Sequence, residues 1–350
     1  MNEQNAQKIN LYDLSLDELE ALMDSWGQPG YRADQVWTWL YEHLETDIDA
    51  MSSLPKSLRT ELKQRTRIEE LSVVGVQESL DGETRKDLLE LPDGETIEVV
   101  LMRYIDRRTA CISTQVGCAV GCRFCATGQM GLHRNLTSGE IMAQVLHFER
   151  ELAAQDQHLT NVVLMGMGEP FLNYENTMAA LTRMIHQQGF RMGQRRITVS
   201  TVGIAPAIRR FAREDTQINL AISLHAATDE LRSDLMPINR RYTLNALFDA
   251  IQFYIDRTNR QVTFEWVLID EVNDTPEQAE ALAARLAGML AHVNIIPLNP
   301  THGFEGRPSP PDRIERFTEI LDQRHVSYTL RLRRGIDIRA GCGQLRVQAS

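Results

Sequence analysis

The feature that most constrains the fold is an alternation of strand-like and helix-like segments from about residue 106 onward. Apolar, β-branched runs predict strands at 109–114, 160–165, 196–200, 218–224, 262–268 and 293–298. Amphipathic segments predict helices at 137–153, 174–188, 243–257, 275–291 and 312–324. Six such units predict an α/β fold, with a parallel sheet that is covered by helices and is either open or curled into a barrel. Chemistry in these folds is expected at the carboxyl ends of the strands.

The chain before residue 106 has a different pattern. A capping-box signature, Ser15 followed three residues later by Glu18, begins the first of three short helices. Three strand-like runs follow, separated by Asp-Gly turn signals at 81–82 and 93–94. We therefore expect an N-terminal helical accessory domain (1–65), a β-meander linker (66–105) and a core with a C-terminal cysteine segment (106–346).

Three of the five cysteines, Cys118, Cys122 and Cys125, lie within eight residues. The polar N-terminus and the lack of a long apolar run lead us to expect a cytoplasmic protein with no membrane contact, where clustered cysteines indicate metal or thiol chemistry. Three thiolates on a four-iron cluster leave one iron open for a small molecule. Structural zinc, with Cys111 or Cys342 as fourth ligand, is the alternative.

The net charge of -11 disfavours broad contact with phosphates, yet arginines cluster in 190–196 and 331–346. A solvated rim is the simpler interpretation of these clusters. If RNA is a partner, we expect its phosphates to contact Arg191, Arg195, Arg196 and the arginines between 331 and 339.

Several motifs resemble one family over residues 95–345. The segment "CAVGCRFC" is similar to the radical S-adenosylmethionine (SAM) signature. The segments "ACISTQVGC", "NVVLMGMGEPFLN", "LAISLHAATDELR", "NIIPLNP" and "GCGQL" resemble the RlmN/Cfr methyltransferases, and most of all the RlmN branch, which modifies C2 of adenine in RNA.

The resemblance implies a partial (βα)6 TIM-like barrel and one [4Fe-4S] cluster on Cys118, Cys122 and Cys125, with two SAM molecules used per turnover. The implied reaction is methylation of C2 of an adenosine in the peptidyl-transferase centre of 23S rRNA, and of the adenosine next to the anticodon in tRNAs. Methylation of C8 of the same rRNA adenosine, the Cfr reaction, is the alternative. The implied partners are 23S rRNA, tRNA and a low-potential reductant such as flavodoxin, and we expect a monomer.

The resemblance also implies roles for individual residues. Cys342 would carry the methyl group, Cys111 would release the product by forming a disulfide with Cys342, and Glu98 would accept a proton. SAM contacts are implied for seven positions: Gly168, Glu169, Ser200, Ser223, Leu224, His225 and Asn299.

Simpler interpretations of these residues exist. A buried strand cysteine is the structural alternative for Cys111, and a solvent-facing strand carboxylate is the alternative for Glu98. The glycine-flanked, arginine-rich setting of Cys342 predicts a thiolate-favouring environment.

Overall fold

The computed structural model describes residues 8–301, 303–331, 335 and 337–345. The N-terminal part contains three helices, α1 (Leu16–Ser25), α2 (Tyr31–Tyr41) and α3 (Lys56–Arg65). The predicted capping box is present, because the Ser15 hydroxyl accepts from the Glu18 amide and the Glu18 carboxylate accepts from the Ser15 amide. The short strands β1 (Ile9–Asn10) and β2 (Thr66–Arg67) pair in parallel and bring the two ends of this domain together.

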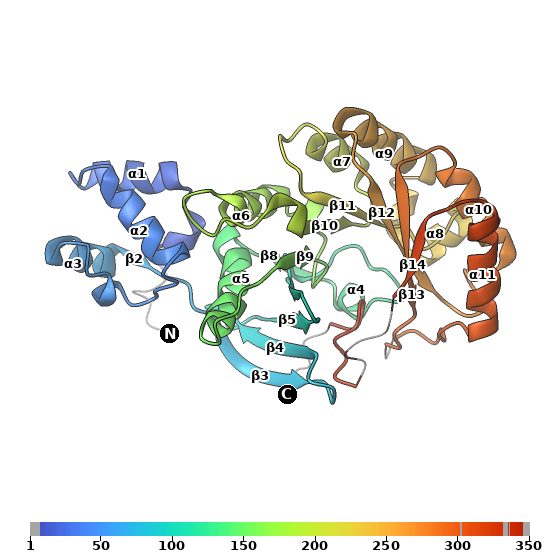
Figure 1. Ribbon diagram of the computed structural model, residues 1–350, viewed down its shortest axis with the longest axis horizontal. Helices are drawn as coiled ribbons and strands as arrows, with labels where there is room; N and C mark the ends of the chain where they lie inside the picture. The colour runs from blue at the N-terminus through green and yellow to red at the C-terminus, as the bar shows by residue number, and fades with distance from the viewer. Residues whose placement is uncertain (1–7, 302, 332–334, 336, 346–350) are drawn as a thin grey trace.

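The N-terminal domain contacts two helices of the core (Figure 1) through the segment that precedes α1. The carboxylate of Asp13 accepts the amide of Gly139 at 2.6 Å, at the start of α5 (Ser138–Ala153). From α6 (Tyr174–Ile185), the guanidinium of Arg183 donates to the backbone carbonyl of Leu14 at 2.8 Å. Apolar residues of the accessory helices and of the barrel belong to one continuous buried cluster.

The core is built on one twisted sheet in the order β14-β13-β12-β11-β10-β9-β6-β5-β4-β3. Every pair from β6 to β14 is parallel. The seven parallel strands are β6 (Arg108–Cys111), β9 (Asn161–Leu164), β10 (Ile197–Thr201), β11 (Asn219–Ser223), β12 (Val262–Leu268), β13 (Ala291–Pro297) and β14 (Tyr328–Leu330). Because β6 and β14 do not pair with each other, the curled sheet forms an open barrel, which confirms the predicted α/β barrel class.

Helices cover the outer face of this sheet (Figure 1). Besides α5 and α6 they are α7 (Ala205–Phe211), α8 (Asp229–Leu235), α9 (Leu244–Thr258), α10 (Pro276–Leu286) and α11 (Pro311–Gln323). The five predicted helices are present, although the segment expected at 275–291 ends at Leu286, and the last part of that range begins β13. The one-to-two-turn helices α7 and α8 were not predicted because seven residues give too little periodicity.

The three strands β3 (Ser72–Glu78), β4 (Thr84–Glu90) and β5 (Thr96–Arg103) form the predicted antiparallel meander. Strand β5 also pairs with β6, so the meander continues the barrel sheet. A small hairpin of β7 (Gln115–Gly117) and β8 (Leu132–Asn135) brackets the short helix α4 (Ala126–Met130). In the described part of the chain, no helix combines the length and apolar character needed to cross a membrane.

Candidate active site

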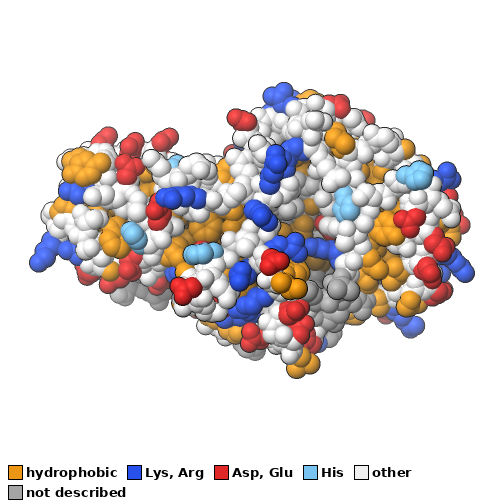
Figure 2. All heavy atoms as spheres, viewed as in Figure 1, with side chains coloured by type: hydrophobic (Ala, Val, Ile, Leu, Met, Phe, Trp, Pro, Cys, Tyr) orange, Lys and Arg blue, Asp and Glu red, His pale blue; other side chains and the backbone are white. Residues whose placement is uncertain are grey.

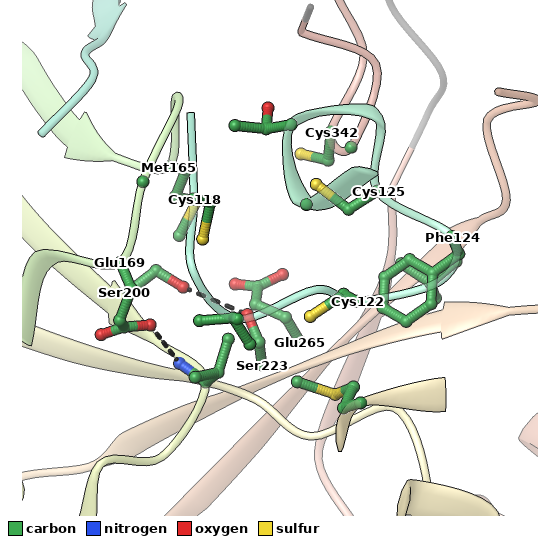
Figure 3. A pocket seen from close by; sticks show the side chains of 18 of the residues that line it. Cys118, Cys122, Phe124, Cys125, Met165, Glu169, Ser200, Ser223, Glu265 and Cys342 are labelled. Atoms are coloured by element: carbon green, nitrogen blue, oxygen red, sulfur yellow. Dashed lines mark hydrogen bonds between the residues drawn. The ribbon is translucent and has the colours of Figure 1, made fainter. Parts of the chain in front are cut away.

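The three clustered cysteines lie in the loop between β7 and α4, on the carboxyl side of the sheet. Figure 3 shows the sulfur atoms of Cys118, Cys122 and Cys125 around one cavity, with Cys342 beside Cys125. Backbone geometry fixes this loop. Gly117 has φ +74°, and a Cβ there would lie 1.9 Å from the carbonyl oxygen of Gly131. A close turn that only glycine permits therefore begins the loop.

We call this space, of about 140 Å³, the upper cavity. Its lining combines the cysteine loop with residues at the carboxyl ends of β9 to β13. The polar and sulfur-containing members that matter most are Cys118, Cys122, Cys125, Glu169, Ser200, Ser223, His225, Glu265 and Cys342.

The chemistry of the three cysteines fits a metal cluster. Burial raises the pKa of Cys118 to about 12 and raises the pKa values of Cys122 and Cys125 as well, and neighbouring thiols add to the effect at Cys118 and Cys122. Thiolates in such a site need a bound cation.

The spacing of the sulfur atoms favours a cluster over a single ion. A tetrahedral zinc with 2.3 Å bonds brings its sulfur ligands to within about 4 Å of one another. Over the described ranges, the only three-residue set of ligand atoms within 4.8 Å of one another is Asp87, His147 and Glu151, so the three thiols are spread more widely. A wide arrangement suits a cluster of several iron atoms.

Glu169 follows β9 and is buried. Its two carboxylate oxygens accept the amides of Phe171 at 3.0 Å and Val202 at 2.8 Å. Burial raises its pKa to about 7, while these hydrogen bonds act in the opposite direction. The preceding Gly168 has φ +104° and would bring a Cβ within 2.6 Å of Gln115. The carboxylate is thereby held at the cavity wall, with lone pairs left for a cationic ligand.

Ser200 on β10 and Ser223 on β11 lie side by side, with their hydroxyl oxygens 3.5 Å apart. His225 also lines the cavity, and its Nδ1 accepts the amide of Val267 at 3.0 Å. Burial lowers the pKa of His225 to about 3, and nearby Arg232 adds to this shift. A neutral imidazole with its proton on Nε2 follows.

Two of the seven predicted SAM contacts lie elsewhere. The side chain of Leu224 packs in the hydrophobic core. Asn299 lies in a second cavity, where its Nδ2 donates to the backbone carbonyl of Cys342 at 3.2 Å. Asn299 therefore positions the Cys342 segment in this structure.

The second cavity, of about 240 Å³, lies deeper in the barrel and contains both remaining cysteines. We call it the lower cavity; its lining includes Cys111, Glu265, Asn294, Asn299, Arg331 and Cys342. Cys111 is buried at the end of β6, whereas Cys342 is exposed and lines both cavities.

The segment that carries Cys342 is bound to the cysteine loop. The amide of Ala126 donates to the carbonyl of Gly343 at 2.7 Å, and the hydroxyl of Thr127 donates to the carbonyl of Leu345 at 2.6 Å. A cysteine about 220 positions away in the sequence thus sits next to Cys125.

One prediction about Cys342 was wrong. Although part of the residue is exposed, the protein around its thiol raises the pKa of Cys342 by desolvation; Arg331 opposes this shift and Glu265 adds to it. For Cys111, burial raises the pKa to about 12. The surroundings of Cys111 and Cys342 therefore do not by themselves favour the thiolate form of either side chain.

Glu98 on β5 is buried, with 6% of its surface exposed, so it is not a solvent-facing strand residue. Its carboxylate pairs with Lys86 of β4 at 2.8 Å. Both residues line a groove of about 860 Å³ beside the C-terminal segment, together with Arg339 and Gln344. Glu98 is absent from the linings of the upper and lower cavities among the described residues.

The predicted RNA-contacting arginines are dispersed. Arg191, Arg195 and Arg196 are exposed, but Arg191 pairs with Glu42. Arg331 lines the lower cavity, and Arg333 and Arg334 lie outside the described residues. Figure 2 shows several Lys and Arg side chains near the centre of one face, between the N-terminal helices and the barrel.

Sequence reasoning missed Glu265, which lines both cavities from the middle of β12. The signal that could have found it is a single carboxylate inside the apolar run "VTFEWVL". It also missed Lys86, the partner of Glu98, because a meander lysine has no local sign of burial.

The chain is similar to known proteins over nearly its whole length. Residues 9–68 match the ribosomal RNA large subunit methyltransferase N-terminal domain, and residues 112–283 match the radical SAM superfamily. The chain is 52% identical over 337 residues to the dual-specificity RNA methyltransferase RlmN 1 of Myxococcus xanthus, covering 96% of this chain and 94% of that protein.

Two further relatives show the same similarity to radical SAM RNA methyltransferases in sequence and to a radical SAM methyltransferase in structure. A probable dual-specificity RNA methyltransferase RlmN of Bacillus mycoides is 45% identical over 342 residues, covering 98% of this chain and 94% of that protein. The crystal structure of a radical SAM methyltransferase from Sphaerobacter thermophilus superposes with a TM-score of 0.94 at 52% identity, covering 97% of this chain and 99% of that chain.

Proposed function

Since the chain belongs to the RlmN family of radical SAM RNA methyltransferases, we propose that it methylates C2 of one adenosine in 23S rRNA and of the adenosine next to the anticodon in tRNAs. The family resemblance seen in the sequence is confirmed. The observation that carries the proposed mechanism is that Cys342 lines both the cavity of the three clustered cysteines and the cavity of Cys111.

Cys118, Cys122 and Cys125 would hold one [4Fe-4S] cluster, leaving one iron without a cysteine ligand. When bound, the cluster supplies the electron that splits SAM into methionine and a 5'-deoxyadenosyl radical. Glu169 would accept a hydrogen bond from the SAM ammonium, and the Ser200 and Ser223 hydroxyls and the neutral His225 would bind its polar groups. Gly168 allows the close approach. Leu224, whose side chain is buried, would then contact SAM through its backbone groups. Asn299 would support the segment that carries Cys342.

The first step would be a displacement at Cys342. Its thiol loses a proton and its sulfur attacks the methyl carbon of one SAM, whose sulfonium leaves as S-adenosylhomocysteine. The raised pKa of Cys342 means that the thiolate must be generated within the complex. Cys342 then carries a thioether methyl group.

The second SAM would provide the radical that removes one hydrogen atom from this methyl group. The methylene carbon on Cys342 adds to C2 of adenine, which gives a covalent link between protein and RNA. One electron would then pass to the oxidised form of the low-potential electron donor, and the C2 proton would leave to a base. The Cys111 thiolate would attack the Cys342 sulfur, and the electron pair of the broken carbon–sulfur bond would stay on the methylene carbon, which would take up one proton to become the methyl group of the RNA. A disulfide between Cys111 and Cys342 would remain. Two SAM molecules are consumed per turnover.

Glu98 would accept the C2 proton. Its carboxylate pairs with the Lys86 ammonium beside the C-terminal segment, a position from which it would act as the base. This assignment requires the adenosine to reach from the upper cavity towards the groove of Lys86 and Glu98.

The remaining partners follow from this chemistry. A low-potential donor such as flavodoxin would supply the electron. The enzyme would work as a monomer in the cytoplasm, where its RNA substrates are made.

Mass spectrometry of nucleosides tests the proposal. Unmodified 23S rRNA and tRNA transcripts are incubated anaerobically with the iron-reconstituted protein, SAM and a reductant. We expect 2-methyladenosine in both RNAs and none with Cys342→Ala. Formation of 8-methyladenosine would instead support the Cfr-type reaction, and SAM cleavage without any methylated adenosine would contradict the proposed substrates.

A further inference from the structure

The barrel interior beneath Cys111 is hollow and polar. Side chains alternate between the two faces of each strand, and the inward-facing residues nearest the amino ends of four strands are all short and polar. These residues are Thr109, Asn161, Thr198 and Thr263. Asn294 adds a further short polar side chain from β13, level with Glu265. A closed barrel fills this position with layers of branched apolar side chains. Here short polar side chains leave the lower cavity open below the two cysteines.

The exposure of residues that line the lower cavity indicates that this cavity reaches solvent. On β10, Ile197 and Val199 face the helices and are fully buried, whereas the inward-facing Thr198 between them is half-buried. The same holds on β12, where Thr263 is half-buried between buried neighbours. At the amino end of the barrel, the lining also includes Arg107, which is exposed. The interior is therefore accessible from the end opposite the cysteine loop.

Unpartnered oxygen atoms also point to a polar occupant. Oε2 of Glu265, Oδ1 of Asn299 and Oγ1 of Thr84 are buried without a hydrogen-bond partner among the described residues, and all three residues line the lower cavity. Buried acceptors of this kind are normally satisfied by water or by a ligand. The cavity thus suits a small hydrated molecule that carries hydrogen-bond donors.

The charges in the lower cavity favour anions. Arg107 lies at the outer end with its guanidinium 4.2 Å from the ring centroid of Tyr104, and Arg331 lies further in. Glu265 is the single acidic residue in the described lining. Two guanidinium groups against one carboxylate give the passage a net positive charge.

We propose that the lower cavity is the entrance through which small thiols, with anionic thiols preferred, reach and reduce the Cys111–Cys342 disulfide. This inference rests on the proposed function, which forms that disulfide once per turnover. One thiolate attacks a disulfide sulfur, forms a mixed disulfide and releases the other cysteine as a thiolate. A second thiol then attacks the mixed disulfide. Two thiols supply two electrons and two protons and leave as a small disulfide.

The two cavities would place methylation and disulfide reduction at opposite ends of the barrel. SAM bound in the upper cavity would cover the approach to Cys342 from the carboxyl end. Cys111 lines only the lower of these two cavities, so a reagent in the lower cavity can reach it while SAM is bound. Reduction would then not have to wait for the upper cavity to empty.

Plugging the lower cavity tests this route. Thr198→Phe and Thr263→Phe would fill it, whereas Thr198→Val and Thr263→Val keep the size of the original side chain and serve as matched controls. The cluster-loaded protein is oxidised to the disulfide and saturated with SAM. Its reduction is then followed by alkylation and peptide mass spectrometry. The reductants are 2-mercaptoethanesulfonate, 2-mercaptoethanol and cysteamine, which differ in charge but little in size, each corrected for its rate with a free model disulfide.

We expect the Phe variants with SAM bound to be reduced at least about tenfold more slowly than the wild type, because a close-packed aromatic ring leaves no passage. The Val variants should match the wild type, and the anionic thiol should be the fastest of the three. Equal reduction rates in the Phe variants and the wild type would overturn this inference but would leave the proposed function intact. Failure of Cys111 and Cys342 to form a disulfide would overturn the release step of the proposed function, and this inference with it.

A second measurement uses the wild-type chain only. With SAM bound, iodoacetamide should alkylate Cys111 in the reduced protein at nearly the rate seen without SAM, whereas a polymer-linked maleimide should not react. Complete protection of Cys111 by SAM against iodoacetamide would contradict a separate lower entrance.

Discussion

The ammonium group of Lys86 pairs with the carboxylate of Glu98 at 2.8 Å. The same ammonium donates to the backbone carbonyl of Arg339 at 3.3 Å, three residues before Cys342. One lysine of the meander thus connects the proposed base to the segment that carries the proposed methyl carrier. In the proposed mechanism, this contact gives the β-meander a role beyond joining two parts of the chain.

Glu98→Gln should stall the reaction after the protein and RNA are linked. Glutamine cannot take the C2 proton, so we expect turnover to fall about a hundredfold, within the range for loss of a general base. The linked species should accumulate on a denaturing gel. Glu90→Gln, at the exposed end of neighbouring β4, is the matched control and should behave as the wild type. Normal turnover by Glu98→Gln would remove Glu98 from the mechanism.

Lys86→Met should destabilise the fold as well as the site. The substitution removes the buried ion pair that the Lys86 ammonium makes with Glu98, and loss of one partner of a buried pair costs about 3 kcal/mol. Denaturant unfolding measures the loss. The double variant Lys86→Met, Glu98→Leu should recover part of the stability without recovering activity, and an unchanged unfolding midpoint in Lys86→Met would show that the pair is not stabilising.

Gly117→Ala should prevent loading of the cluster. Gly117 and Gly121 both have positive φ, but only at Gly117 would a Cβ collide with another atom, the carbonyl oxygen of Gly131. Gly121→Ala meets open space and should incur only the backbone strain of about 1 kcal/mol. Iron content after anaerobic reconstitution should therefore fall in the first variant and stay near the wild-type value in the second. Equal iron content in both would show that loop geometry does not control loading.

His225 should make the fold sensitive to acid. Its pKa is about 3 in the folded chain and 6.5 in the reference state, so the unfolded chain binds the extra proton between these values. Stability should therefore fall as pH decreases below 6.5, by at most about 1.4 kcal/mol per pH unit for this group. His225→Asn keeps an acceptor for the Val267 amide and should flatten the difference in stability between pH 7 and pH 5. The same pH dependence in both proteins would contradict a buried neutral histidine.

The sequence was sufficient for features that depend on local periodicity or on a compact motif. The five longer barrel helices and the cysteine loop belong to this group, because each is defined within a few turns or residues. The surroundings of Glu98 and Cys342 could not be predicted, since Lys86 and Arg331 reach them only through the folded sheet. The burial of Leu224 and the place of Asn299 in the lower cavity likewise depend on which way a strand end turns.

The central claim is that Cys342 carries the methyl group to RNA as a methylene carbon. The protein is first incubated with SAM whose methyl group carries three deuterium atoms, so that Cys342 acquires the labelled methyl group, and excess SAM is removed. RNA and unlabelled SAM are then added under reducing, anaerobic conditions. Mass spectrometry of the nucleoside from this first turnover should show 2-methyladenosine with two deuterium atoms, because one deuterium leaves before the carbon bond forms. A product with three deuterium atoms would mean that the methyl group was transferred intact, and a product without deuterium would mean that Cys342 is not the carrier.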